Sequence, residues 1–473
     1  MKPFSLLFRN VLLAAVVINL FSVEPPKAPV PQSPFIPIVY GYADAMLKSG
    51  RDSFGPEKTG VFLSALDRVA LAPLTNRPPS PAGIPPANRL GSGGEPMAVA
   101  NPQHDQNLLR LLYLLSELSA KPLYRAAADA ELKWFLEHAV STNADRVPWG
   151  VNVGWDVIKD SPVPHDARSL QPEFLRPWML WDRCFEVAPA ASRRLAFDLL
   201  AASGFRGGSR RSPNESLRNA GVFIRSCAVA YARTKDERFL KAVETAALYF
   251  ADMLEPQSAV GSPGFPSTSL LSLAIDCDGA AHRVPDPAAG QLRRLAARVD
   301  ELFCALPHEL KKQGGFQIGG SQPERGEGAS PLWKPGAPGG TTAQIGMMCV
   351  SRYDNSANLS YRELLLAAAD AYLNSVPEKT EDVWPATFGH AISLQLAAWR
   401  HTANPAYFTS ARKLGQFAVE AFWGAQKLPR ASLQTDHYEA LTGGATLALA
   451  LAELHLQILH ITAVRCPPNT IDR

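Results

Sequence analysis

Three stretches of this 473-residue chain repeat one pattern, and that repetition constrains the fold more than any other feature. SAKPLYRAAADAELKWFLEH starts at Ser119, RTKDERFLKAVETAALYFADM at Arg233 and HTANPAYFTSARKLGQFAVEAFW at His401. Each follows a strongly apolar stretch, opens on a short polar turn, and has one aromatic near its start and another ten residues later. Ten residues are close to three helical turns, so we expect both aromatics on one face. The paired aromatics are Tyr124 and Trp134, Phe239 and Tyr249, and Tyr407 and Phe417.

The spacing of these stretches predicts further helix hairpins between them. Tyr124 and Phe239 are 115 residues apart and Phe239 and Tyr407 are 168 apart, close to two and three multiples of about 56. Apolar segment pairs at suitable positions supply the missing members. The predicted hairpins begin near Asp105, Pro172, Asn214, Ser267, Thr342 and Ala386, and a last helix runs from Tyr438 to His460.

The last helix indicates that the hairpins close into a ring. Its sequence, YEALTGGATLALALAELHLQILH, is apolar almost all round and therefore needs covering. The segment 38–47, IVYGYADAML, is a helix without a partner and can supply that cover. An open solenoid would instead need polar terminal caps. We therefore expect an all-α fold, a closed α/α toroid of six or seven hairpins that forms a single domain over residues 38–473.

The N-terminal 23 residues have the features of an export signal. Lys2 and Arg9 precede an apolar run from Val11 to Phe21, and a Pro-rich linker follows at residues 24–37. We expect a signal peptide in residues 1–23 and a periplasmic or extracellular protein; an uncleaved anchor, the sole membrane contact we would expect, is the alternative. The net charge of +3 and the absence of a long Lys/Arg run give no support for nucleic-acid binding. Six scattered cysteines are expected to be buried thiols rather than disulfides.

The hairpin pattern resembles the six-hairpin glycosidases and the α/α-toroid polysaccharide lyases. The segments YGYADAMLKSGRDSFGPEKTGVFLSALDR and TDHYEALTGGATLALALAELH are similar to those of bacterial secreted proteins grouped with pectate lyases. This resemblance implies a carbohydrate-active enzyme acting on a polysaccharide or oligosaccharide. Rings of this kind host hydrolases, lyases and epimerases, so the resemblance is more specific for architecture than for chemistry.

Four clusters at the ends of predicted inner helices are candidates for the site. PQHDQNLLR contains His104 and Asp105; a helix N-cap is the alternative role for Asp105. VPWGVNVGWDVIKDSPVPHDAR offers aromatic faces and carboxylates suited to sugars, or tryptophans that anchor a loop. FRGGSRRSPNESLRN could hold carboxylates through its arginines, or could be a solvated loop. TDHYEALTGG places ionisable groups before the buried last helix, or caps it with Asp436.

From these clusters we predict the catalytic set and the binding set. The candidate catalytic residues are His437, Tyr438, His104, Asp105 and Asp156. The candidate substrate-binding residues are Trp149, Trp155, His165, Arg206, Arg210, Arg211, Trp384 and Glu439. We expect His104, Asp156 and His437 to lie at the same mouth of the ring. Two long Gly/Pro-rich loops, 75–96 and 317–342, are of the length that is usually functional or disordered.

Two mechanisms fit these residues. A lyase that cleaves a uronate polysaccharide by β-elimination needs a base, such as His437, Tyr438 or His104, and a cation such as an arginine to neutralise the substrate carboxylate. A glycoside hydrolase instead needs paired carboxylates, for which Asp105, Asp156 and Glu439 are available. A non-catalytic glycan-binding ring is a third class. Scattered carboxylates leave no readable metal spacing, so a divalent cation such as calcium stays open.

Overall fold

A computed structural model describes residues 33–74, 76–86, 89, 97–139, 149–163, 173–203, 217–255, 265–306, 308, 310–318, 329–334 and 340–470. Residues 33–473 form one compact unit, and all the elements described below belong to it. The expected signal peptide in residues 1–23 and most of the linker lie outside the described residues. Among the described residues, no helix has the length and apolar character needed to cross a membrane.

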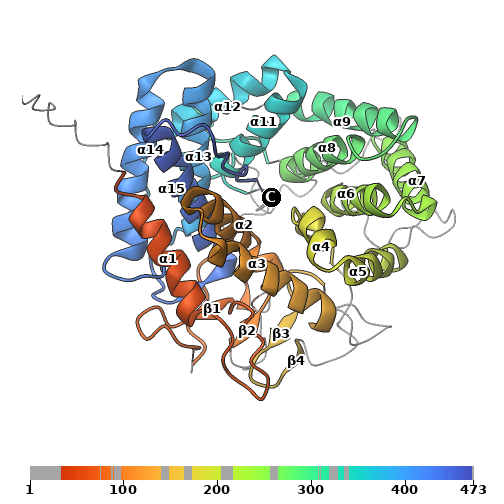
Figure 1. The fold of residues 1–473 in the computed structure, drawn as a ribbon. Helices are drawn as coiled ribbons and strands as arrows, with labels where there is room; N and C mark the ends of the chain where they lie inside the picture. Colours follow the sequence, from red (N-terminus) through yellow and green to blue (C-terminus); the bar gives the residue numbers. More distant parts are fainter. Residues whose placement is uncertain are drawn as a thin grey trace, which may run out of the picture. The chain divides into compact units, whose positions relative to one another are not determined.

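The described part of the chain is built from helix hairpins, as the repeat predicts (Figure 1). Six pairs follow one another: α2 (Pro102–Ser119) with α3 (Pro122–Trp134), α4 (Trp181–Val187) with α5 (Pro189–Ala202), α6 (Leu217–Thr234) with α7 (Glu237–Met253), α8 (Ser267–Ala281) with α9 (Ala288–Cys304), α11 (Thr342–Ser356) with α12 (Leu359–Ala371), and α13 (Pro385–Thr402) with α14 (Pro405–Ala418). A short helix, α10 (Leu310–Gln313), packs on α12. The first helix of each pair begins close to the predicted start, except α4, which begins at Trp181 and not near Pro172.

The ring is closed by the first and last helices. α1 (Ile36–Ser49) packs on α15 (Gly444–Ile458), which lies between α2 and α13. From α13 the inner contacts continue through α11, α8, α6 and α4, and α4 meets the first hairpin through α3. The α/α toroid is therefore confirmed, with α1 and α15 as a seventh pair. α15 is shorter than expected because Gly443 and Gly444 begin it, so Tyr438 lies in a strand instead.

Burial explains why inner and outer helices differ in sequence. The inner helices pack on both sides, so α13 and α15 are buried along almost their whole length. The outer helices bury one face. On that face lie the first aromatics of the repeat: the hydroxyls of Tyr124 and Tyr407 donate to Asp44 and Asp370 on neighbouring outer helices. The second aromatics are less buried, and Phe417 is exposed. Trp134 and Tyr249 still pack partly against the core and Phe417 stacks on Phe388 of α13, so the second aromatics lie at the edge of the buried face because ten residues fall short of three full turns.

Two small sheets lie at the N-terminal end of α2 and α15. β1 (Ala65–Leu66) pairs antiparallel with β5 (Tyr438–Glu439), and β2 (Val99–Ala100) pairs with β3 (Gly154–Asp156), which pairs with β4 (Ser161–Val163). The backbone N–H of Ser64 donates to the carbonyl of Val99 and so links the two sheets. These strands carry residues that the sequence analysis selected, and they bring them to one end of the ring.

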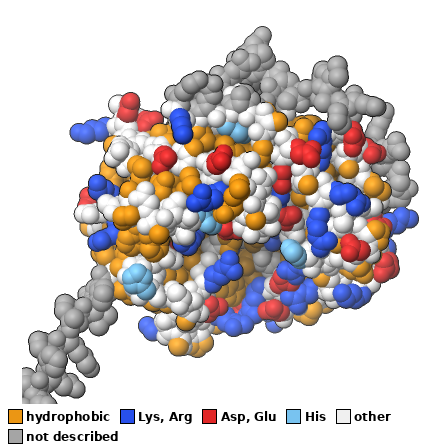
Figure 2. All heavy atoms as spheres, turned by 90° about the horizontal axis from the view of Figure 1, so that it is seen from above, with side chains coloured by type: hydrophobic (Ala, Val, Ile, Leu, Met, Phe, Trp, Pro, Cys, Tyr) orange, Lys and Arg blue, Asp and Glu red, His pale blue; other side chains and the backbone are white. Residues whose placement is uncertain are grey.

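The state of the cysteines and the mixture of surface charges agree with what the sequence predicts. All six cysteines are free thiols, four of them buried, so the preference for thiols over disulfides is confirmed. On the face shown in Figure 2, basic and acidic side chains are interspersed. This mixture fits the small net charge of the chain.

Candidate functional site

The side chains around β5 divide between two environments. Successive side chains in a strand point to opposite faces, so His437 and Glu439 share one face and Tyr438 takes the other. Pairing with β1 fixes this register, with Ala65 opposite Glu439. The face of His437 and Glu439 is covered by Arg89, which also binds the carbonyl of Pro78, whereas Tyr438 points into the helical wall.

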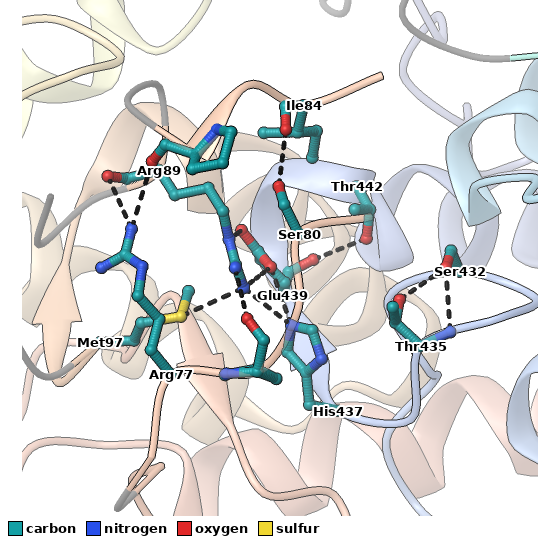
Figure 3. Close-up of polar contacts among 12 residues, drawn as sticks. Arg77, Ser80, Ile84, Arg89, Met97, Ser432, Thr435, His437, Glu439 and Thr442 are labelled. Carbon is teal, nitrogen blue, oxygen red and sulfur yellow. Dashed lines mark hydrogen bonds and ion pairs between the residues drawn. The ribbon is translucent and has the colours of Figure 1, made fainter. Parts of the chain in front are cut away.

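Arg89 joins His437 and Glu439 into a compact polar cluster (Figure 3). Arg89 Nε donates to Glu439 Oε1 at 3.0 Å and Nη2 donates to Oε2 at 2.7 Å, a bidentate pair. His437 Nε2 lies 2.8 Å from Glu439 Oε2 and 3.3 Å from Arg89 Nη2. Arg89 also binds the carbonyl of Pro78 and the sulfur of Met97. We call Arg89, His437 and Glu439 the Arg89 cluster.

The Arg89 cluster is almost fully buried. Arg89 and His437 are each 3% exposed and Glu439 is 4% exposed. Burial raises the pKa of Glu439, but the hydrogen bonds from His437 and Arg89 outweigh it and hold the pKa below its ordinary value. Glu439 is therefore a carboxylate. His437 Nδ1 is buried and has no hydrogen-bond partner among the described residues. A carboxylate-held imidazole with an unpartnered nitrogen has the composition of a general base.

Tyr438 and Asp105 lie apart from this cluster, in the wall between inner and outer helices. The Tyr438 hydroxyl is 2.9 Å from the Tyr42 hydroxyl of α1. The Asp105 carboxyl is fully buried and has no hydrogen-bond partner among the described residues. Burial raises its pKa well above the ordinary value, and the nearby Glu131 carboxyl raises it further. Asp105 is not the N-cap of α2 either, because Asn101 fills that position. The catalytic roles expected for Tyr438 and Asp105 do not fit these positions.

His104 and Asp156 lie at the same end of the ring as His437 but are engaged separately. His104 Nε2 is 2.8 Å from the carbonyl oxygen of Val151. The Asp156 carboxylate accepts from the backbone N–H groups of Ile158 and Lys159 and so caps the turn after β3. The position of all three residues at one end agrees with the expectation of a shared mouth.

The tryptophans of the second sequence cluster are core residues. Trp149 packs edge-on against Trp178 with ring centroids 5.0 Å apart, and Trp155 packs against Trp134 at 5.2 Å. Both are buried, which leaves no ring face for a sugar. Loop anchoring, the alternative for these residues, fits the structure, and their predicted binding role does not.

Trp384 is half-buried at the N-cap of α13 and fastens the loop that carries Arg89. Its Nε1 donates to the carbonyl of Ala82 at 3.0 Å, and the Ala82 N–H donates to Asp382. The loop therefore runs from the end of β1 across to α13. Trp384 positions this cover over the cluster.

The remaining predicted residues lie outside the described part of the chain. These are His165, Arg206, Arg210 and Arg211. Within the described residues, no group of three or more His, Cys, Asp or Glu side chains is suited to hold a metal ion.

Arg89 is the residue that sequence reasoning missed. It lies in the loop 75–96, which was selected for its length, but no residue within that loop was singled out. An arginine in a Gly- and Pro-rich loop belongs to no helical or strand periodicity. Its partners at 437 and 439 are about 350 positions away, so no local pattern connects them to it. Only the fold reveals the pairing.

The fold and the buried ionisable cluster define an α/α toroid with a polar site at one end. Residues 86–200 match the family model described as periplasmic pectate lyase, so over this part the chain is similar to a carbohydrate-active enzyme family. No curated protein sequence matches the chain.

Among solved structures, the chain is similar to cellobiose 2-epimerase from Bacillus thermoamylovorans (8% identity, covering 89% of this chain and 99% of that one, TM-score 0.47). It is also similar to a GH76 α-mannanase from Bacteroides thetaiotaomicron (10%, 89% and 96%, TM-score 0.46) and to an unsaturated glucuronyl hydrolase specific for heparin (13%, 70% and 98%, TM-score 0.42). Each TM-score is below 0.5, so nothing about substrate or reaction follows from these likenesses.

Proposed function

We propose that this protein is a polysaccharide lyase that cleaves a uronate-containing polysaccharide by β-elimination, with His437 as the base. The observation that carries the proposal is the Arg89 cluster, in which a buried carboxylate holds an imidazole whose second nitrogen has no partner among the described residues. The match of residues 86–200 to the periplasmic pectate lyase model supports the reaction class.

In β-elimination the base removes one particular proton, the one on C5 of the uronate. His437 Nδ1 removes the proton from C5 of the uronate, and the electron pair forms the C4–C5 double bond as the C4–O4 bond breaks. The departing oxygen takes a proton, so one product carries an unsaturated end and the other a hydroxyl. Charge that develops on the substrate carboxylate needs a cation nearby. Arg206, Arg210 and Arg211 stay the candidates for that role.

Substrate access requires a covering segment to move, because His437 is buried in this structure. The described part of the cover is the segment 76–86, which is tied to α13 by Trp384 and Asp382. The two hydrogen bonds at Ala82 lie at the exposed surface, whereas Pro81 and Ile84 are buried and the carbonyl of Pro78 accepts from Arg89, so opening also breaks these inner contacts. We propose that this segment opens to admit the polysaccharide.

The test is absorbance of unsaturated products on a panel of uronate polysaccharides. His437→Ala should lower turnover by about 10²- to 10⁴-fold, the usual contribution of a positioned base. Tyr438→Phe is the matched control, because the neighbouring hydroxyl bonds to Tyr42 in the wall and its loss should leave turnover close to that of the parent. Normal cleavage by His437→Ala would refute the base assignment.

The paired-carboxylate hydrolase finds less support in the site. Asp105 lies in the helical wall and Asp156 caps its own turn, so neither carboxylate flanks Glu439. Release of saturated reducing sugars alone by the parent protein would nevertheless replace the lyase with a hydrolase. Binding without any cleavage would indicate a glycan-binding ring.

The proposed location is outside the cytoplasm. The basic and apolar N-terminal pattern supports export, and the matching family model is described as periplasmic. An acidic polysaccharide, not a nucleic acid, is the proposed partner, with calcium an open possibility for its binding. Detection of the protein in a periplasmic extract, with the mature N-terminus sequenced, tests both export and cleavage.

A further inference from the structure

We infer that Arg89 is a positioning residue that keeps Glu439 ionised and thereby fixes the tautomer of His437. The inference rests on the proposed function for its catalytic meaning, but its geometry stands alone. Arg89 comes from the covering loop, Glu439 and His437 come from β5, and all three are buried together. No residue of that loop figures in the expected catalytic or binding sets.

The shortest contact of His437 Nε2 assigns the proton on the imidazole. Arg89 Nη2 carries two hydrogens. Nη2 lies 2.7 Å from Glu439 Oε2, 3.2 Å from the sulfur of Met97 and 3.3 Å from His437 Nε2, so two hydrogens serve three partners and the contact to His437 is the longest of the three. A carboxylate only accepts hydrogen bonds. The contact of 2.8 Å between His437 Nε2 and Glu439 Oε2 then requires the hydrogen to be on Nε2. Nδ1 is left as an acceptor.

The surroundings of Nδ1 support the same tautomer. A hydrogen on Nδ1 would be a buried donor with no acceptor among the described residues, which is costly. A lone pair there costs less and is what a base requires. Glu439 therefore does for His437 what an orienting carboxylate does in a catalytic triad, and Arg89 supplies the charge that keeps this carboxylate ionised in a buried place.

Loss of Arg89 should therefore act through Glu439. A buried carboxylate without its cation takes up a proton or draws one onto the imidazole. In the first case Nε2–H loses its ionised acceptor, and in the second Nδ1 gains a hydrogen, so either change ends the single neutral Nε2–H tautomer. Arg89→Lys retains the charge but cannot form the two parallel hydrogen bonds, so it should restore the tautomer only in part. Arg89→Met removes both charge and hydrogen bonds.

The experiment uses the full chain with ¹⁵N-labelled histidine and reads the imidazole nitrogen shifts, which distinguish the two tautomers. The spectrum of His437→Gln identifies the signal of His437. We expect a single Nε2–H tautomer in the parent, a mixture or a cation in Arg89→Met, and partial recovery in Arg89→Lys. A parent signal from Nδ1–H, or an unchanged Nε2–H signal in Arg89→Met, overturns the inference.

Arg183→Met is the matched control. Arg183 on α4 forms a similar two-bond pair with Asp129, at 2.7 and 2.5 Å, outside the cluster. Its loss should cost stability without changing the His437 signal. In a kinetic assay, Arg89→Met should lower kcat with little change in KM. The loss should not exceed the contribution of the base itself, which is roughly 10²- to 10⁴-fold. The tautomer measurement needs no substrate, so an inactive parent protein would defeat the proposed function and leave this inference to its own test.

Discussion

At the residue scale, the described part of the chain buries two acidic side chains, Glu131 and Asp105, beside each other. Glu131 and Asp105 face each other across the wall between α3 and α2, with the hydroxyls of Tyr42 and Tyr438 nearby. Glu131 Oε2 accepts from the backbone N–H of Phe62 at 2.8 Å, but Oε1 has no partner among the described residues. The pair is buried without a full set of donors. Burial therefore raises the pKa of both carboxyls.

Protonation of Glu131 predicts a pH dependence of stability. Burial raises its pKa from 4.5 to about 8, so the folded state keeps a proton that the unfolded state releases. The free energy of unfolding should fall by up to about 1.4 kcal/mol per pH unit from about pH 4.5 to 8 and then level off. Asp105, whose pKa is also raised, adds to the same trend.

Denaturant unfolding of Glu131→Gln across that range tests the prediction. The variant should show a shallower slope with pH, because its amide does not titrate. An unpartnered buried amide N–H lowers stability equally at every pH, which shifts the curve without tilting it. Glu244→Gln on α7 is the control and should retain the parent slope. An unaltered slope in Glu131→Gln would assign the pH dependence to other groups.

At the scale of elements, inner helices approach closely where glycine permits it. Gly389 on α13 faces α15, and a Cβ at this position would lie 2.9 Å from the backbone carbonyl of Thr446. Gly41 on α1 is different, because its added Cβ would meet only Lys427, at 3.7 Å. The two glycines share helical backbone but not surroundings. Close approach of α13 and α15 fixes the part of the ring beside β5.

Substitution of these two glycines should have opposite effects. Gly389→Ala should destabilise the fold by about 1 to 3 kcal/mol, because it overpacks a backbone contact. Gly41→Ala should stabilise it by about 0.4 to 1 kcal/mol, since alanine restricts the unfolded chain at an uncrowded helical site. Thermal unfolding of both variants beside the parent measures this. Equal shifts of the same sign would contradict the packing described for α13 and α15.

For the whole molecule, the C-terminal segment runs from α15 toward the middle of the ring (Figure 1). The carbonyl of Pro468 accepts from Arg110 of α2 at 2.8 Å, and the amide of Asn469 donates to the Thr446 carbonyl of α15 at 3.2 Å. Asn469 also lies 3.5 Å from the Ser393 hydroxyl of α13. One short segment therefore ties three inner helices together.

Removal of this segment should lower the stability of the ring. A chain that stops after Arg465 loses a hydrogen bond to a buried cation and the contacts of Asn469, which together are worth about 2 to 4 kcal/mol. A chain that stops after Thr470 retains these contacts and is the control. Thermal unfolding of both truncated proteins compares them with the parent. Parent-like melting of the shorter chain would show that the segment does not hold the ring.

The sequence by itself determined the architecture, because hydrophobic periodicity is a local signal. The repeat of about 56 residues predicted the hairpins, and the apolar last helix predicted its pairing with α1. It also selected His437 and Glu439, since ionisable groups before a buried helix need a polar surrounding. The tertiary structure decided which side chains meet. Strand alternation at β5 turned Tyr438 away from its neighbours, and a loop remote in sequence brought Arg89 to Glu439. Such contacts depend on chain segments separated by hundreds of residues, and no local pattern encodes them.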